Sequence, residues 1–149
     1  MSIIRVTREF TFEMAHALKG YDGPCKNVHG HSYRLFVTVS GVPVSDKSGP
    51  KNGMLIDFNV LREIVQEKII DRFDHSLVIS SNFDDERKKM LSESFENMLI
   101  VNYQPTCEKL VENFAEILKN AFPAGVNLHS LKLYETVKSY AEWYASDNE

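Results

Sequence analysis

The chain has 149 residues, of which 43% are apolar and 26% charged, and its formal net charge is −4. Length and composition predict one globular domain over residues 1–149, and the acidic balance argues against nucleic acid or an anionic membrane as partner. Two cysteines, Cys25 and Cys107, are too few for a disulfide framework. Because we find no membrane-length apolar run and no secretory signal, we expect a cytoplasmic protein with free thiols.

Two long strands are predicted in the first third of the chain. Over residues 3–17 apolar side chains alternate with polar ones, and His16 falls on the apolar side. A second strand is expected over residues 29–41, with His29 and His31 on its apolar side. A turn-forming stretch separates the two strands, so antiparallel pairing would bring the three imidazoles together at one end of a sheet.

Three converging imidazoles can hold one divalent metal ion. Catalytic zinc sites typically have three nitrogen ligands and an open fourth position, whereas structural zinc sites are closed by four ligands rich in cysteine. Gly30 lets the backbone approach the metal closely, and Cys25, shortly before His29, would place a thiol beside it. The set predicts a metal site for acid–base chemistry. The alternative is that these histidines only face solvent or form hydrogen bonds.

Two amphipathic helices are predicted in the middle of the chain. Residues 42–53 have the composition of a loop, and Asp57 then caps a helix that runs to about Phe73. Thr106 caps the second helix, whose apolar stripe continues to Ala121. Both helices need a sheet face to cover their apolar sides.

The remaining segments complete an α+β pattern. Residues 84–95 are expected to form a short exposed helix and residues 98–101 a brief strand, and two closing strands are expected over residues 128–136 and 140–145. The order ββααββ indicates an antiparallel sheet with both long helices on one face. Exposed sheet edges are commonly protected by pairing with another subunit, so we expect an oligomer whose sheets join into a barrel.

Three acidic positions and one histidine add candidate chemistry. Asp74 adjoins His75 at the end of the first helix and can orient its imidazole for proton transfer; a His favoured by the helix dipole is the alternative. Glu135 continues an inward apolar row, and a heterocycle with two neighbouring N–H donors would satisfy it. A structural salt bridge is the alternative for Glu135. The helix dipole alone explains Glu108.

Six short motifs that contain these residues run through nearly the whole chain. They are Phe12–His16, Cys25–Tyr33, Asp57–Phe58, Asp74–Leu77, Pro105–Glu108 and Glu135–Thr136. Together they resemble the 6-pyruvoyl-tetrahydropterin synthase superfamily. The short gap between Cys25 and His29 is similar to the 6-carboxytetrahydropterin synthase branch of queuosine biosynthesis.

The resemblance implies a fold, an assembly and a set of site residues. The fold is the tunnelling fold, in which ββααββ subunits join as trimers into a β-barrel, two trimers stack into a homohexamer, and active sites lie between subunits. The implied site residues are His16, His29 and His31 as Zn²⁺ ligands, Cys25 as catalytic thiol, Asp74 and His75 as a proton-transfer pair from a neighbouring subunit, Glu135 as the pterin anchor, and Thr106 and Glu108 in the segment that holds the pterin. Cys107 stands where relatives more commonly have Ser or Thr, and residues 80–104 receive no role.

The resemblance also implies a reaction. It is the conversion of 7,8-dihydroneopterin triphosphate to 6-carboxy-5,6,7,8-tetrahydropterin with release of acetaldehyde and triphosphate; the alternative is 6-pyruvoyl-tetrahydropterin synthesis without side-chain cleavage. Zinc would act as a Lewis acid, Cys25 as a thiolate base, and His75 would return protons on the other face. Electrons move within the substrate, and the chain has no Gly-rich dinucleotide motif, so no nicotinamide or flavin is expected.

Two hypotheses from other classes stay open. A zinc hydrolase would use metal-bound hydroxide, so that Cys25 would be dispensable. In a non-catalytic scaffold, zinc would only hold the strands of an assembly together. Such a protein would dissociate or unfold on chelation and would bind no pterin. The inward carboxylate Glu135 and the open fourth metal position favour catalysis over the scaffold. The cations that meet the triphosphate are not assigned, and Lys19, Lys26 and Arg34 are merely near in sequence.

Overall fold

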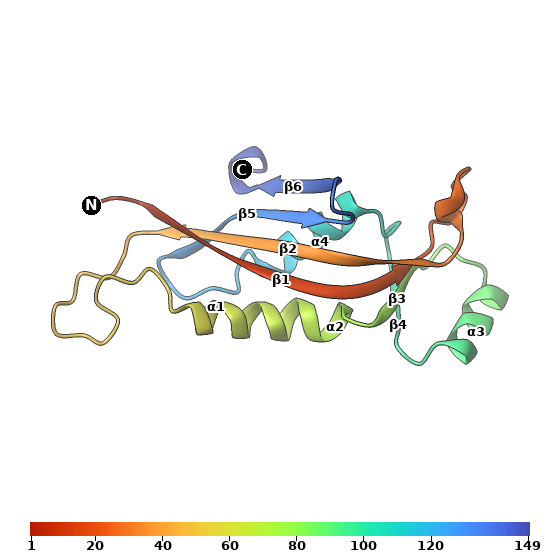
Figure 1. Ribbon diagram of the computed structural model, residues 1–149, viewed down its shortest axis with the longest axis horizontal. Coiled ribbons are helices and arrows are strands. Elements are labelled where there is room, and N and C mark those ends of the chain that lie inside the picture. Colours follow the sequence, from red (N-terminus) through yellow and green to blue (C-terminus); the bar gives the residue numbers. More distant parts are fainter.

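A long antiparallel hairpin forms the centre of the computed structural model, which describes residues 1–149 (Figure 1). Strands β1 (Ile4–His16) and β2 (His29–Gly41) pair along their whole lengths, with His16 opposite His29. Alternation of apolar and polar side chains determines which face of the hairpin is buried, because neighbouring residues of a strand point to opposite faces. Both predicted strands and their pairing are confirmed.

Four further strands extend the hairpin into a curved six-stranded sheet. On one side, β5 (Val126–Tyr134) pairs with β2 and β6 (Tyr140–Tyr144) pairs with β5, both antiparallel. On the other side, β3 (Ser76–Ser80) pairs in parallel with the last residues of β1, and β4 (Met98–Val101) pairs in parallel with β3. The strand order is β4-β3-β1-β2-β5-β6.

The sheet therefore differs from the expected antiparallel sheet in one respect. The α+β class and the brief strand at β4 are confirmed, but β3 was not predicted and makes the sheet mixed. All five residues of β3 are buried, so the segment lacks the alternation that identifies a half-exposed strand. Strand β5 also ends at Tyr134, which places Glu135 just after the strand and not inside it.

The first predicted helix is continuous but not uniform. It comprises α1 (Phe58–Val65), a π-helical stretch (Gln66–Ile70) and α2 (Asp71–Phe73). Its predicted N-cap is confirmed, since a carboxylate oxygen of Asp57 accepts a hydrogen bond from the backbone N–H of Asn59 at 2.8 Å. The π-helical stretch was not predicted.

The other two helices each begin directly after a capping residue, of which Thr106 was predicted as a cap. Helix α4 (Cys107–Leu118) starts after Thr106, whose hydroxyl accepts from the backbone N–H of Lys109. The short exposed helix α3 (Asp85–Ser94) starts after Asp84 and lies at the end of the molecule beside β3 and β4 (Figure 1). No helix has both the length and the apolar character needed to cross a membrane.

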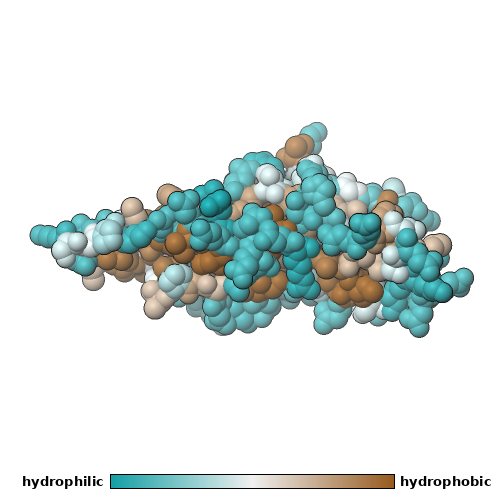
Figure 2. Space-filling view, turned by 90° about the horizontal axis from the view of Figure 1, so that it is seen from below, coloured by the Kyte–Doolittle hydropathy of each residue, from teal (hydrophilic) through white to brown (hydrophobic).

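The core lies between the sheet and the two long helices. Phe12 of β1 stacks on Tyr33 of β2 with ring centroids 5.1 Å apart. Phe114 of α4 contacts both Phe12, at 6.1 Å, and Phe73 of α2, at 4.9 Å. Both helices therefore cover the same face of the sheet, as predicted. Seen from the α1 side, the surface is largely hydrophilic with separate hydrophobic patches (Figure 2).

Three strand edges have no partner strand within the chain, and one of them is the outer edge of β4, which pairs only with β3. Strand β1 pairs with β3 only over Met14–His16, so its edge over Ile4–Glu13 is open. Strand β6 pairs only with β5, which leaves its outer edge open as well. Open edges present unpaired N–H and C=O groups that another subunit can pair with.

Candidate metal centre and active site

Three imidazoles meet at one end of the hairpin. His16 is the last residue of β1, and His29 and His31 open β2 and point to the same face because they are two residues apart. One ring nitrogen from each lies within 4.8 Å of the other two. The predicted convergence of the three imidazoles is confirmed, and the cluster could hold a metal ion.

Backbone carbonyls fix the tautomer that two of these rings adopt when neutral. Nδ1 of His16 donates to the carbonyl oxygen of Pro105 at 2.7 Å, and Nδ1 of His29 donates to that of Asn27 at 2.7 Å. In the neutral rings, each Nε2 then carries a lone pair, and these two Nε2 atoms are 3.0 Å apart. Two facing lone pairs repel unless a cation lies between them, and such carbonyl contacts typically orient metal-bound histidines.

His31 supplies the third nitrogen. Its Nε2 is buried and has no hydrogen-bond partner, since Oε1 of Glu135 at 3.7 Å is too far to accept a hydrogen bond. Burial lowers the pKa of both His31 and His16 and outweighs the opposing effect of nearby Glu135. Both rings are therefore neutral near pH 7, which is the form that binds a metal. The donor set fits a divalent cation of zinc type.

A cavity of ≈ 320 Å³ opens beside the histidine cluster. Four segments far apart in sequence line it: the end of β1, the 3-10 turn Pro24–Lys26, the first turn of α4 and the residues after β5. Its lining includes His16, Cys25, Thr106, Cys107, Glu108 and Glu135. The fold thus brings together the predicted thiol, one predicted metal ligand and all three predicted substrate-binding residues.

The two cysteines of this cavity differ in their surroundings. Cys25 lies in the 3-10 turn, which is held to the end of β1 by a hydrogen bond from the N–H of Leu18 to the carbonyl of Cys25. Sγ of Cys107 donates to the carbonyl of Leu133 at 3.3 Å. Burial, with a further contribution from Glu135, raises the pKa of Cys107 to about 12. Cys107 is therefore a protonated thiol at neutral pH.

Asp74 and His75 form a fixed corner between α2 and β3. Nδ1 of His75 lies 3.0 Å from Oδ1 of Asp74, and the same oxygen accepts from the backbone N–H of Glu13 at 2.9 Å. Partial burial opposes ionisation, but these two contacts hold the pKa of Asp74 below its usual value. His75 has a left-handed backbone with φ of 56°, and its side chain is 77% exposed. Such backbone strain is typical of functional positions.

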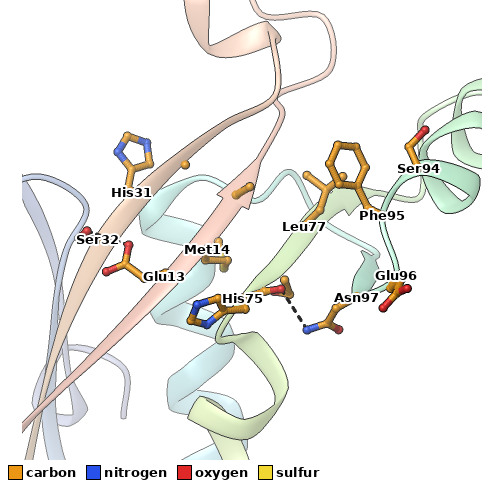
Figure 3. A pocket seen from close by; sticks show the side chains of 13 residues that line it. Glu13, Met14, His31, Ser32, His75, Leu77, Ser94, Phe95, Glu96 and Asn97 are labelled. Atoms are coloured by element: carbon orange, nitrogen blue, oxygen red, sulfur yellow. Dashed lines mark hydrogen bonds between the residues drawn. The ribbon is translucent and has the colours of Figure 1, made fainter.

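His75 does not line the cavity that contains Cys25. It lines a larger cavity of ≈ 660 Å³ together with Glu13, Ser32 and the segment before β4 (Figure 3). Glu13 and Ser32 belong to the polar side of the hairpin, opposite the core. His31 of the histidine cluster also lines the larger cavity, so within one chain the Asp74–His75 pair is separate from the cavity of Cys25 but not from the whole cluster.

Several residues of the site were not singled out from the sequence. Tyr33 follows His29 and His31 on the same side of β2, is fully buried, and has a hydroxyl without a partner. Burial strongly raises its pKa. Tyr21, Ser139 and Tyr140 line the cavity beside Cys25. Alternation already places Tyr33 on the same side of the strand as His29 and His31, whereas the positions of the others depend on loop geometry.

The metal-free protein is expected to lose stability as pH falls. The folded-state pKa values of His16 and His31 lie below the unfolded value of 6.5, so between these values the unfolded chain binds more protons. The contribution of these two histidines to the free energy of unfolding is fully present above about pH 6.5. It is lost as the pH falls from 6.5 toward their pKa values in the folded protein. Urea unfolding of chelator-treated protein at several pH values measures this. The pKa of His129 is also lowered, so the measurement is made in the His129→Gln variant to remove its contribution. A urea midpoint that stayed unchanged or rose at low pH would contradict the expectation.

Comparison with known proteins follows the whole length of the chain. The model of the family described as 6-pyruvoyl tetrahydropterin synthase matches residues 5–146. The chain is 34% identical over 143 residues to 6-carboxy-5,6,7,8-tetrahydropterin synthase of Haemophilus influenzae, covering 95% of this chain and 99% of that protein. It is 30% identical over 146 residues to the protein of the same name from Rickettsia felis, covering 94% and 99%.

The architecture is also that of solved structures. The structure of 6-pyruvoyl tetrahydropterin synthase from Caenorhabditis elegans matches with a TM-score of 0.67 and 24% sequence identity, over 97% of both chains. The match includes the curved sheet and both long helices, which confirms the expected tunnelling-type subunit fold.

Proposed function

Because the chain belongs to the 6-pyruvoyl tetrahydropterin synthase family, we propose that it converts 7,8-dihydroneopterin triphosphate to 6-carboxy-5,6,7,8-tetrahydropterin. The reaction is a zinc-dependent lyase reaction that releases acetaldehyde and triphosphate. The names of the relatives from H. influenzae and R. felis support this product. The observation that carries the proposal is the histidine cluster beside a cavity that holds both a thiol and a carboxylate.

His16, His29 and His31 would hold the zinc ion. The two Nε2 atoms at 3.0 Å and the unpartnered Nε2 of His31 are the atoms available to it. When bound, zinc supplies Lewis-acid stabilisation of charge on the substrate's side-chain oxygens. A zinc ion held by these three residues would stay open to a ligand from the substrate.

Cys25 and Glu135 act on the substrate from the walls of the cavity. Glu135 has an ionisable side chain that is only 25% exposed, and it accepts the neighbouring N–H donors of the pterin ring. Cys25, as thiolate, takes a proton from the substrate side chain. Thr106 and Glu108 border the pterin from the start of α4, although the hydroxyl of Thr106 also caps that helix.

The Asp74–His75 pair returns a proton to the substrate from a neighbouring subunit. His75 is exposed and oriented by Asp74, which suits it for proton transfer, yet it does not line the cavity of Cys25 in its own chain. A second copy must therefore bring it there. We place this contact in a trimer whose sheets close into a barrel through the open edges of β1 and β6, with two trimers forming a hexamer.

Product analysis tests the proposal and separates it from its alternative. Zinc-loaded protein is incubated with 7,8-dihydroneopterin triphosphate, and products are identified by mass spectrometry. We expect 6-carboxy-5,6,7,8-tetrahydropterin, acetaldehyde and triphosphate, which would support a role in queuosine biosynthesis. A 6-pyruvoyl product without acetaldehyde would show instead that the protein is a 6-pyruvoyl-tetrahydropterin synthase. The match to the family of that name favours this alternative. Recovery of unchanged substrate would refute both.

A further inference from the structure

The larger of the two cavities has a wall that the proposed reaction does not use. The cavity of ≈ 660 Å³ lies between the end of β1, the start of β2, which includes His31, the start of β3 and the segment Ser94–Asn97. Leu77 and Phe95 lie together on one wall and Glu96 lies toward the outside (Figure 3). Glu96 forms no ion pair within the chain. The cavity thus combines an apolar wall with an unpaired negative charge.

The turn between β5 and β6 has complementary properties. Val137 at its tip is an apolar residue that is 82% exposed, and the adjacent Lys138 is exposed and forms no ion pair within the chain. The turn is well ordered, since the hydroxyl of Thr136 accepts from the N–H groups of Lys138 and Ser139 at 3.3 and 3.1 Å. An ordered turn loses little conformational entropy on docking.

Strand directions bring the turn and the cavity of different copies to the same place. Because β1, β2, β5 and β6 pair antiparallel in succession, β1 and β5 run in one direction and β2 and β6 in the other. Rotation about an axis along the strands keeps these directions, so the open edge of β6 in one copy meets the open edge of β1 in the next as an antiparallel pair. The turn of the first copy then arrives at the end of β1 where the cavity of the second copy lies.

From this juxtaposition we propose that the turn Thr136–Ser139 of one subunit docks in the larger cavity of its neighbour. Val137 packs on Leu77 and Phe95, and Lys138 pairs with Glu96. This inference rests on the trimer of the proposed function, and it adds a specific contact between the subunits. Docking sets the register of β6 of one subunit against β1 of the next. Because Glu135 directly precedes the turn, docking also places Glu135 of the incoming subunit beside His75 of the subunit that has the cavity. The segment before β4 thereby becomes a receptor that aligns two halves of one active site.

Charge reversal and its rescue test the pairing. In full-length, zinc-loaded protein, Lys138→Glu and Glu96→Lys each place like charges at the contact, and we expect each to weaken subunit association about tenfold or more by analytical ultracentrifugation. The double variant restores opposite charges, so it is expected to regain most of the wild-type association. Lys68→Glu changes an exposed lysine of the π-helical stretch and serves as the matched control.

The outcomes separate this inference from the proposed function. Single variants that associate like wild type, a double variant without rescue, or a wild-type protein that is monomeric would each overturn the docking. Absence of the pterin product from a protein whose association follows the expected pattern would overturn the proposed function and leave the docking supported. Both singles weakened and the double restored would establish the contact.

Discussion

Replacing His31 with alanine is expected to abolish stoichiometric metal binding and to lower kcat about 10³-fold or more. Two imidazoles hold a divalent cation far more weakly than three, and loss of the cation removes several kcal/mol of transition-state charge stabilisation. His31 is the best ligand to remove because its Nε2 has no hydrogen-bond partner within the chain. In contrast, His16 and His29 each donate to a backbone carbonyl, so their replacement also breaks a hydrogen bond.

Elemental analysis of the purified variant, with steady-state kinetics, measures this effect. His129→Ala is the matched control, because His129 lies on β5 outside the cluster and should be removable without loss of metal. If His31→Ala retained stoichiometric metal, the assignment of the ligands would be wrong. If it lost metal and also dissociated or unfolded, while wild type bound no pterin, the scaffold hypothesis would replace the catalytic one.

The histidine cluster was predictable because its geometry is almost entirely local. Alternation along two strands placed His16, His29 and His31 on one face, and antiparallel pairing of those strands made the rings converge. No long-range contact is needed for this result, since the paired strands are neighbours in sequence. The carbonyl contacts of Pro105 and Asn27 were not predictable in the same way, because they depend on where separate loops come to lie.

The part of the sheet beyond β1 was harder to predict. Strand β3 is buried on both faces, so its sequence Ser76–Ser80 shows no period that separates strand from core helix. Just before this strand, the N–H of His75 donates to the carbonyl of Glu13 and Oδ1 of Asp74 accepts from the N–H of Glu13, and His75 has a left-handed backbone there. The dipeptide was visible in the sequence, but its separation from Cys25 within one chain was visible only in the fold.

Replacing Cys25 with alanine is expected to lower kcat by about 10²–10⁴-fold while zinc stays bound. This is the range that a positioned general base typically contributes, and Cys25 is not one of the three cluster residues. The variant is assayed for acetaldehyde release and for metal content in the same preparation. A zinc hydrolase that uses metal-bound hydroxide would keep its activity in this variant, so undiminished turnover would contradict the proposed role of the thiol.

Cys107→Ala provides the internal control, because both cysteines line the same cavity. Since its pKa is raised to about 12, Cys107 is almost fully protonated at neutral pH and cannot serve as a thiolate base. Its Sγ instead donates to the carbonyl of Leu133, so its loss should reduce stability modestly and leave kcat within a few-fold of wild type. If the two variants lost activity equally, the effect would reflect the shape of the cavity and not the chemistry of one thiol. A large loss in Cys25→Ala alone would identify the thiol that removes the proton.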